Sequence, residues 1–207
     1  IEEQLDCFRK GFPFLEIMAS ASVEKGISVI DKEAQVGYME AWDAYLNQNK
    51  RILKFVPASG AASRMFKDLY EFLDSDSNEP FSPFMEKFFA GLTSFAFYNA
   101  LDAVCLKNEK RTIPQLLSDK EYKAVVNNLL SSSGLNYGQL PKGLLQFHTY
   151  PACVRTAMEE HLAEGAMYAK NNAAEVNIHF TVSPEHKALF EQLVAAKVPA
   201  YENKFSV

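Results

Sequence analysis

The sequence predicts an α/β protein with a parallel sheet, N-terminal helices and an inserted helical subdomain. Two strand-like apolar segments are each followed by a segment with helical spacing, and a long helical stretch separates these two units. Such alternation of strands and helices is typical of parallel sheets. We expect an N-terminal helical region at 1–50, an incomplete α/β core at 51–73 and 135–207, and a helical insertion at 74–134.

Composition argues against several classes of function. The net charge of −5 disfavours nucleic-acid binding, which usually needs a basic face. No apolar run reaches about 18 residues, so we expect no membrane span. The three cysteines are scattered and include no Cys-x-x-Cys pair, which predicts free thiols in a cytoplasmic protein. Nothing in the sequence indicates the oligomeric state.

The N-terminal region and the first strand have clear local signals. Residues 31–49 carry apolar side chains at helical spacing, and Asp31 is a suitable N-cap. The β-branched and aromatic run 51–56 stops at Pro57 and predicts a buried strand. Helical spacing returns at residues 65–73, after a turn of small residues.

The helical insertion follows a polar linker and is predicted to contain three helices. Ser82-Pro83 is typical of a helix start, because proline is tolerated at the first helical position. Ser118 and Glu121 have the spacing of a capping box.

The last third of the chain predicts a second strand between two helices. Residues 155–169 have helical spacing, 176–182 alternate apolar and polar side chains, and Ser183-Pro184 starts another helix. We expect a further strand near Tyr201. Sheets usually contain about five or six strands, so the rest of the sheet is expected outside these 207 residues.

The turn between the first strand and its helix has the composition of a phosphate-binding loop. Small side chains let a ligand approach the backbone, and the N-terminus of a following helix favours anions. Arg64 adds a forked cation suited to phosphate oxygens. The candidate contacts are Ala58, Ser59, Gly60, Ala61 and Ser63. These residues fit an ordinary tight turn with a solvated Arg64 equally well.

The same stretch resembles the signature loop of the sugar-1-phosphate nucleotidyltransferases, Ala-Gly-Gly-x-Gly-Thr-Arg-Leu. Ala58, Gly60 and Arg64 match that loop, and a serine replaces its threonine. Ser59 and Ala62 stand where the family usually has glycine. The resemblance implies a partial GT-A, Rossmann-like fold, with the first strand leading into a nucleotide-binding turn.

A second point of resemblance is the dipeptide Pro141-Lys142. The family carries a Pro-Lys pair after its signature loop, and that lysine neutralises phosphate charge during transfer. On this analogy Lys142 is catalytic, together with Arg64. Because residues 65–141 lie between them, we expect the ends of the helical insertion to return to one edge of the sheet. The alternative interpretation of Lys142 is a residue of an ordinary surface loop.

The third point of resemblance is strand 176–182 with its Ser-Pro turn. His148 and Ser183 are candidate substrate contacts, although a structural histidine and a helix cap explain them as well. The whole chain also resembles an uncharacterised bacterial family of unknown function. Its motifs include Phe-Val-Pro-Ala-Ser-Gly-Ala, Leu-Pro-Lys-Gly-Leu and Thr-Val-Ser-Pro-Glu-His.

The nucleotidyltransferase resemblance implies binding of a nucleoside triphosphate and transfer of its nucleoside monophosphate to a sugar 1-phosphate. It also implies Mg²⁺, with the metal ligands outside this chain, so these residues alone are expected to be inactive. The alternative is a non-catalytic α/β nucleotide- or ligand-binding or scaffold domain. The replacements Ser59 and Ala62 favour that alternative.

Overall fold

The computed structural model describes residues 1–48, 50–80 and 82–206. Asn49, at the end of the predicted helix 31–49, and Val207 lie outside the described residues. The chain forms two compact units, Ile1–Gln48 and Asn49–Val207. Each unit is described by itself.

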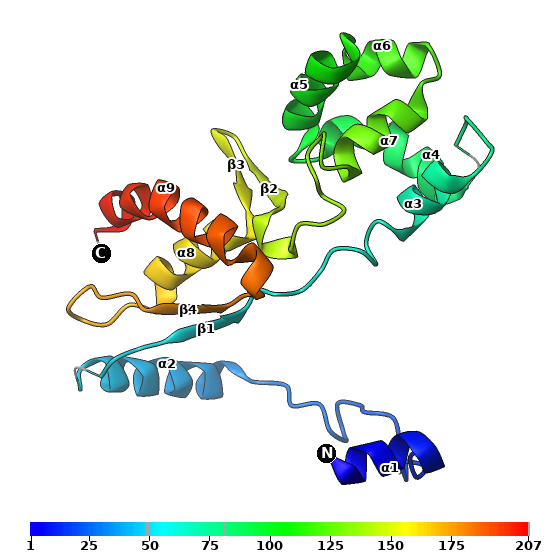
Figure 1. Ribbon diagram of the computed structural model, residues 1–207. Coiled ribbons are helices and arrows are strands. Elements are labelled where there is room, and N and C mark those ends of the chain that lie inside the picture. The colour runs from blue at the N-terminus through cyan, green and yellow to red at the C-terminus, as the bar shows by residue number, and fades with distance from the viewer. Residues whose placement is uncertain (49, 81, 207) are drawn as a thin grey trace. The chain divides into compact units, whose positions relative to one another are not determined.

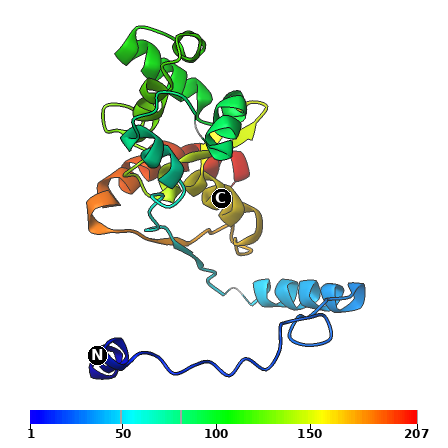
Figure 2. The ribbon, with the colours of Figure 1, turned by 90° about the vertical axis from the view of Figure 1, so that its right-hand side faces the viewer.

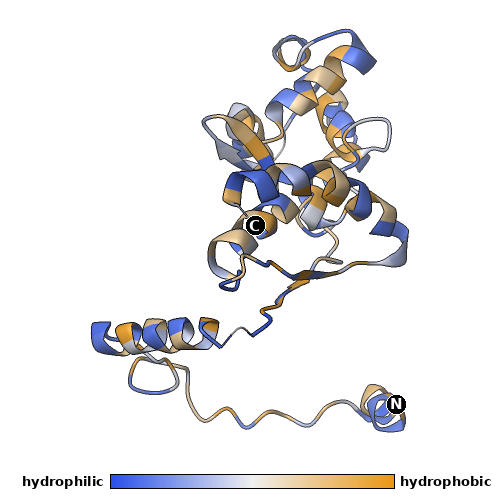
Figure 3. Ribbon diagram, turned by 90° about the vertical axis from the view of Figure 1, so that its left-hand side faces the viewer, coloured by the Kyte–Doolittle hydropathy of each residue, from blue (hydrophilic) through white to orange (hydrophobic). Residues whose placement is uncertain are grey.

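The first unit contains two helices with little buried surface. Helices α1 (Glu2–Lys10) and α2 (Lys32–Leu46) contain no buried residue. Asp31 is the N-cap of α2, as predicted, and its Oδ1 accepts a hydrogen bond from the Ala34 amide at 2.8 Å. Hydrophobic and hydrophilic stretches alternate along α2 (Figure 3). Trp42 and Tyr45 stack on one side of this helix, with ring centroids 5.8 Å apart.

The second unit contains a helical block with its own apolar core (Figure 1). Phe72, Leu101 and Leu129 are fully buried in this core. Ser82 caps its helix as predicted, but the capping box is formed by Thr112 and Gln115 instead of Ser118 and Glu121. The helices are α3 (Lys67–Asp74), α4 (Pro83–Ala90), α5 (Tyr98–Glu109), α6 (Ile113–Ser118) and α7 (Tyr122–Leu130), with a short 3-10 helix η1 (Leu92–Ser94).

Helix α3 packs in the helical block although the sequence assigned it to the α/β core. Its buried residues, Leu69 and Phe72, belong to the same core as Val125 and Leu129 of α7. The apolar stripe of α3 is therefore covered by helices. The apolar core of the block thus includes residues on both sides of the expected insertion boundaries, from Ala62 to Leu145.

The parallel sheet consists of strands β1 (Lys54–Pro57) and β4 (Ile178–Thr181). Phe55 pairs with His179 and Val56 with Phe180, so each pair lies on one face of the sheet. Helices α8 (Ala157–Tyr168) and α9 (Lys187–Phe205) cover the face of Val56 and Phe180 (Figures 1 and 2). Phe55 is exposed and stacks on His179. The predicted burial of this strand therefore holds for only one of its two faces.

Two further predictions about the last third of the chain are corrected. Residues predicted to start a helix at 155 belong to a hairpin of β2 (Gln146–Tyr150) and β3 (Cys153–Thr156), and α8 starts only after Thr156. The strand expected near Tyr201 is absent from the described residues, because α9 continues through Pro199. Short 3-10 helices, η2 (Lys142–Leu144) and η3 (Pro184–His186), precede β2 and α9.

The mixed α/β class with a parallel pair of strands is confirmed. Among residues 1–48, 50–80 and 82–206, no helix combines the length and the apolar character needed to cross a membrane.

Candidate functional site

The small-residue turn and the Pro-Lys dipeptide are adjacent in the structure. Ala61 and Pro141 form an antiparallel bridge, and the Lys142 amide donates a hydrogen bond of 3.0 Å to the Gly60 carbonyl. The helical block thus leaves the sheet after β1 and returns to the same place. Lys142 is exposed, whereas Pro141 is buried.

A small cavity of about 150 Å³ lies between these two segments and the start of α8. Open α/β sheets bind ligands at the carboxyl ends of their strands, and this cavity lies at that end of β1. Pockets for whole drug-sized ligands measure about 300–1,000 Å³, so this one has room for a single group such as a phosphate. Its lining residues are Val56, Pro57, Ala58, Gly60, Lys142, Gly143, Ala157, Met158, His161 and Phe180.

The turn leaves open space on its outer side. A Cβ added to Gly60 would meet no atom within 4 Å, and the φ angle of Gly60 is not in the left-handed region. Ala62 is 1% exposed and belongs to the helical core, so its methyl group does not narrow the turn. Ser59, Ala61 and Ser63 are exposed at the surface of the turn.

Arg64 is exposed and is not among the residues that line the cavity. Within the part of the chain that the structure describes, its guanidinium has no hydrogen bond or ion pair. The sequence predicted helical spacing from residue 65, directly after Arg64, but α3 begins only at Lys67. The first turn of α8 lines the cavity instead, through Ala157 and Met158.

The two candidate substrate contacts lie elsewhere. His148 is exposed on β2, where it pairs with Arg155 of β3. Ser183 precedes η3 and makes no capping hydrogen bond, because its Oγ contacts Nδ1 of His186 at 2.9 Å. Neither residue is among those that line the cavity.

No role was predicted for His161, which the structure places in the cavity wall. Its Nδ1 lies 3.2 Å from Oε2 of Glu164, and its ring contacts Phe180 edge to face. Glu164 also pairs with Lys54 of β1. His161, Glu164 and Tyr168 are spaced i, i+3 and i+7 along α8, and such spacing places side chains on one stripe of a helix. This spacing is the one feature of the sequence that could have indicated that the three side chains lie together.

Electrostatics favour the charged forms of Lys54 and Glu164. The hydrogen bond from Lys54 lowers the pKa of the Glu164 carboxyl, although partial burial acts in the other direction. Burial by itself lowers the pKa of Lys54, but hydrogen bonds to Glu164 and Tyr168 outweigh it and raise that pKa above its ordinary value. Glu164 is therefore a fixed carboxylate beside His161.

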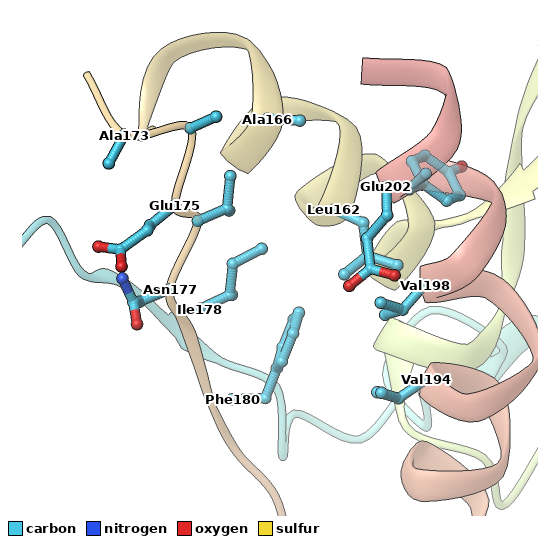
Figure 4. A pocket seen from close by; sticks show the side chains of 13 residues that line it. Leu162, Ala166, Ala173, Glu175, Asn177, Ile178, Phe180, Val194, Val198 and Glu202 are labelled. Atoms are coloured by element: carbon cyan, nitrogen blue, oxygen red, sulfur yellow. The ribbon is translucent and has the colours of Figure 1, made fainter. Parts of the chain in front are cut away.

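A larger cavity of about 520 Å³ lies between α8, α9 and the segment before β4 (Figure 4). Apolar side chains such as Leu162, Ile178 and Val198 form much of its wall. Glu175 and Glu202 line it from opposite sides, and the Glu175 carboxylate points away from it (Figure 4). Among the described residues, no lysine or arginine lines this cavity. The negative charge of its two glutamates therefore disfavours a phosphate ligand there. The smaller cavity, with Lys142, is the better candidate for an anion.

Comparisons with known proteins give a family but no described activity. No curated protein matches the chain, and no solved structure matches it. One family matches along residues 1–207, the same span over which the sequence resembles a family of unknown function. The chain belongs to the family described as "Domain of unknown function (DUF4301)".

Proposed function

We propose that the cavity between the β1 turn and Lys142 binds a phosphate group of a nucleoside triphosphate. The observation that carries the proposal is the hydrogen bond from the Lys142 amide to the Gly60 carbonyl. It fixes a lysine beside an open turn of small residues, at the edge of a parallel sheet where ligands bind. A phosphate in the cavity would meet the lysine ammonium, while the nucleoside would lie outside, over the exposed turn.

The proposed reaction is that of a nucleotidyltransferase-like, GT-A protein. An oxygen of a sugar 1-phosphate attacks the α-phosphorus of the triphosphate, the bond to the β-phosphate breaks, and pyrophosphate leaves. Charge spreads over the non-bridging oxygens in such transition states, so nearby cations lower the barrier. We assign Lys142 to the α-phosphate and Arg64 to the departing phosphates, which it would reach from the outer side of the turn.

The proposed chemistry also involves Mg²⁺, which the resemblance to nucleotidyltransferases implies. No group of three or more His, Cys, Asp or Glu side chains within residues 1–48, 50–80 and 82–206 could hold a metal ion. The described residues therefore do not fit a metal site, and no step is assigned to a metal held by this chain.

Calorimetric titration of the chain with ATP, GTP, CTP and UTP tests the binding. At least one triphosphate should bind, and Lys142→Ala should weaken it about tenfold or more, because a hydrogen bond to a charged group contributes about 1.5–3 kcal/mol. Lys107→Ala is the matched control, since Lys107 is also exposed and lies on α5 of the helical block. Absence of binding by all four triphosphates would refute the proposal, as would equal affinity of the two variants.

The alternative, a non-catalytic binding domain, predicts the same binding but no chemistry. An assay of the protein for pyrophosphate release, with the bound triphosphate, a panel of sugar 1-phosphates and Mg²⁺, separates the two. Release that disappears in Lys142→Ala supports transfer. Tight binding without release supports the alternative.

A further inference from the structure

His161 is held in one orientation by its neighbours on α8 and β1. Glu164 lies 3.2 Å from its Nδ1 atom and 2.5 Å from the ammonium of Lys54. Tyr168 donates a further hydrogen bond of 3.1 Å to the same carboxylate oxygen. One carboxylate oxygen therefore joins the histidine to a lysine whose side chain is only 11% exposed.

The position of Lys54 explains why this cluster exists. Lys54 is two residues before Val56, so both lie on the face of β1 that the helices cover. A lysine on a covered face needs a partner, because an unpaired buried charge is costly. Glu164 supplies that partner and is itself fixed by it.

The other ring nitrogen of His161, Nε2, makes no hydrogen bond within the described residues. A carboxylate only accepts hydrogen bonds, so Nδ1 must carry the proton that is donated to Glu164. In the neutral ring Nε2 then has a free lone pair, and in the protonated ring it carries a second N–H. His161 lines the cavity beside Gly60 and Lys142, and a protonated Nε2 would donate to an anion bound there.

We propose that His161 is a second side-chain ligand of the phosphate group in this cavity, and that Glu164 and Lys54 are positioning residues for its ring. This inference rests on the proposed phosphate site and adds a residue to it. A bound phosphate would lie between the Lys142 ammonium and the imidazolium of His161. The same arrangement, a histidine oriented by a carboxylate, recurs wherever proteins need a histidine of fixed tautomer.

The first test is the tautomer of His161 in the free protein. The chain has four histidines, so ¹H–¹⁵N spectra of their rings are simple, and the signal lost in His161→Gln assigns this residue. At a pH at which the ring is neutral, His161 should carry its proton on Nδ1. Glu164→Gln should weaken that preference, whereas a role in packing alone would leave the tautomer unaffected. A proton on Nε2 in the unaltered protein would overturn the inference.

The second test uses inorganic tripolyphosphate, which carries the triphosphate group without a base. Its addition should shift the His161 ring signals and the amide signals of Gly60 and Gly143 together. His161→Gln should weaken its binding about tenfold, on the scale of one charge-assisted hydrogen bond. The matched control is His179→Gln, at an exposed histidine outside the cavity, and it should leave the affinity unchanged.

The two tests separate failure of this inference from failure of the phosphate site. Shifts at Gly60 and Gly143 with an unmoved His161 ring would refute the role of His161 and leave the site intact. If neither tripolyphosphate nor any nucleoside triphosphate shifts these signals, the phosphate site itself is refuted, and the role of His161 with it.

Discussion

Gly143 and Gly60 line the same cavity, yet an added methyl group has opposite consequences at the two positions. A Cβ on Gly143 would lie 2.9 Å from Cζ and 3.1 Å from Cε1 of Phe190. Phe190 is 4% exposed and packs in the small core with Ala58 and Met158. The ring therefore cannot move away without disturbing that core. A Cβ on Gly60 would meet nothing within 4 Å.

The expected magnitudes follow from these distances. Overpacking of a core by a methyl group costs about 1–3 kcal/mol, and loss of glycine freedom in the unfolded chain returns about 0.4–1 kcal/mol. Gly143→Ala should therefore destabilise the second unit by about 1–2 kcal/mol. Gly60→Ala should be neutral or stabilising by up to about 1 kcal/mol, because its φ angle suits alanine.

Urea unfolding, followed at single residues, measures both effects. Trp42 belongs to the first unit, so tryptophan fluorescence does not report on the cavity. The amide of Ala58, which donates to the Thr181 carbonyl at 2.9 Å, reports on it directly in ¹H–¹⁵N spectra. The cost of Gly143→Ala should shrink in a Phe190→Leu background, since coupled neighbours are not additive. Equal stability of Gly143→Ala and Gly60→Ala would refute the reasoning.

Other predictions concern the core, the thiols and the ion pair of Lys54 and Glu164. Leu129→Ala should lower the free energy of unfolding by about 2–5 kcal/mol in the same urea assay, because Leu129 is fully buried. Cys153 is exposed and should react with a thiol reagent at pH 8, whereas Cys105 should react only after unfolding, since burial raises its pKa to about 11. Because Lys54 lowers the pKa of Glu164, their contribution to stability should be complete above about pH 4.3 and fall as pH drops through the folded-state pKa. Acid titration of Lys54→Met should lack that fall, and an unchanged acid profile would contradict it.

Several elements of the fold could be predicted because their signals are local. The cap of α2 at Asp31 and the start of α4 at Ser82-Pro83 depend on neighbouring residues alone. The first parallel strand was expected from a short run of β-branched and aromatic residues, and the second from alternating apolar and polar side chains. Their register was not, since it depends on which residues of each strand face α8 and α9.

The elements that were missed lack a local signal or carry a misleading one. The hairpin of β2 and β3 has mostly exposed or half-buried residues, so apolar alternation does not mark it. Pro199 suggests that a helix ends, yet α9 continues to Phe205. Its residues Val194, Val198 and Tyr201 have helical spacing, and all three line the larger cavity. Packing of α9 against α8 therefore outweighs the local signal of the proline, which is accommodated within the helix.

The candidate site was predictable only in part for a similar reason. The pairing of the turn with Lys142 could be expected from the order of motifs along the chain. His161 could not, because its role depends on the meeting of α8 with Lys54 of β1. A stripe of His, Glu and Tyr on a helix is common. It indicates a binding site only when the residues that pack against this stripe are known.

The helical block also explains how so long an insertion is compatible with a defined site. The entropic cost of closing a loop grows slowly with its length, so a long insertion is tolerated when its ends are fixed. Here Ala62 is buried in the helical core at the start of the block. At its end, the buried Tyr137 accepts a hydrogen bond from the Gln146 amide at 3.1 Å. The folded block therefore holds the two segments that form the cavity, and its core keeps Gly60 and Lys142 next to each other.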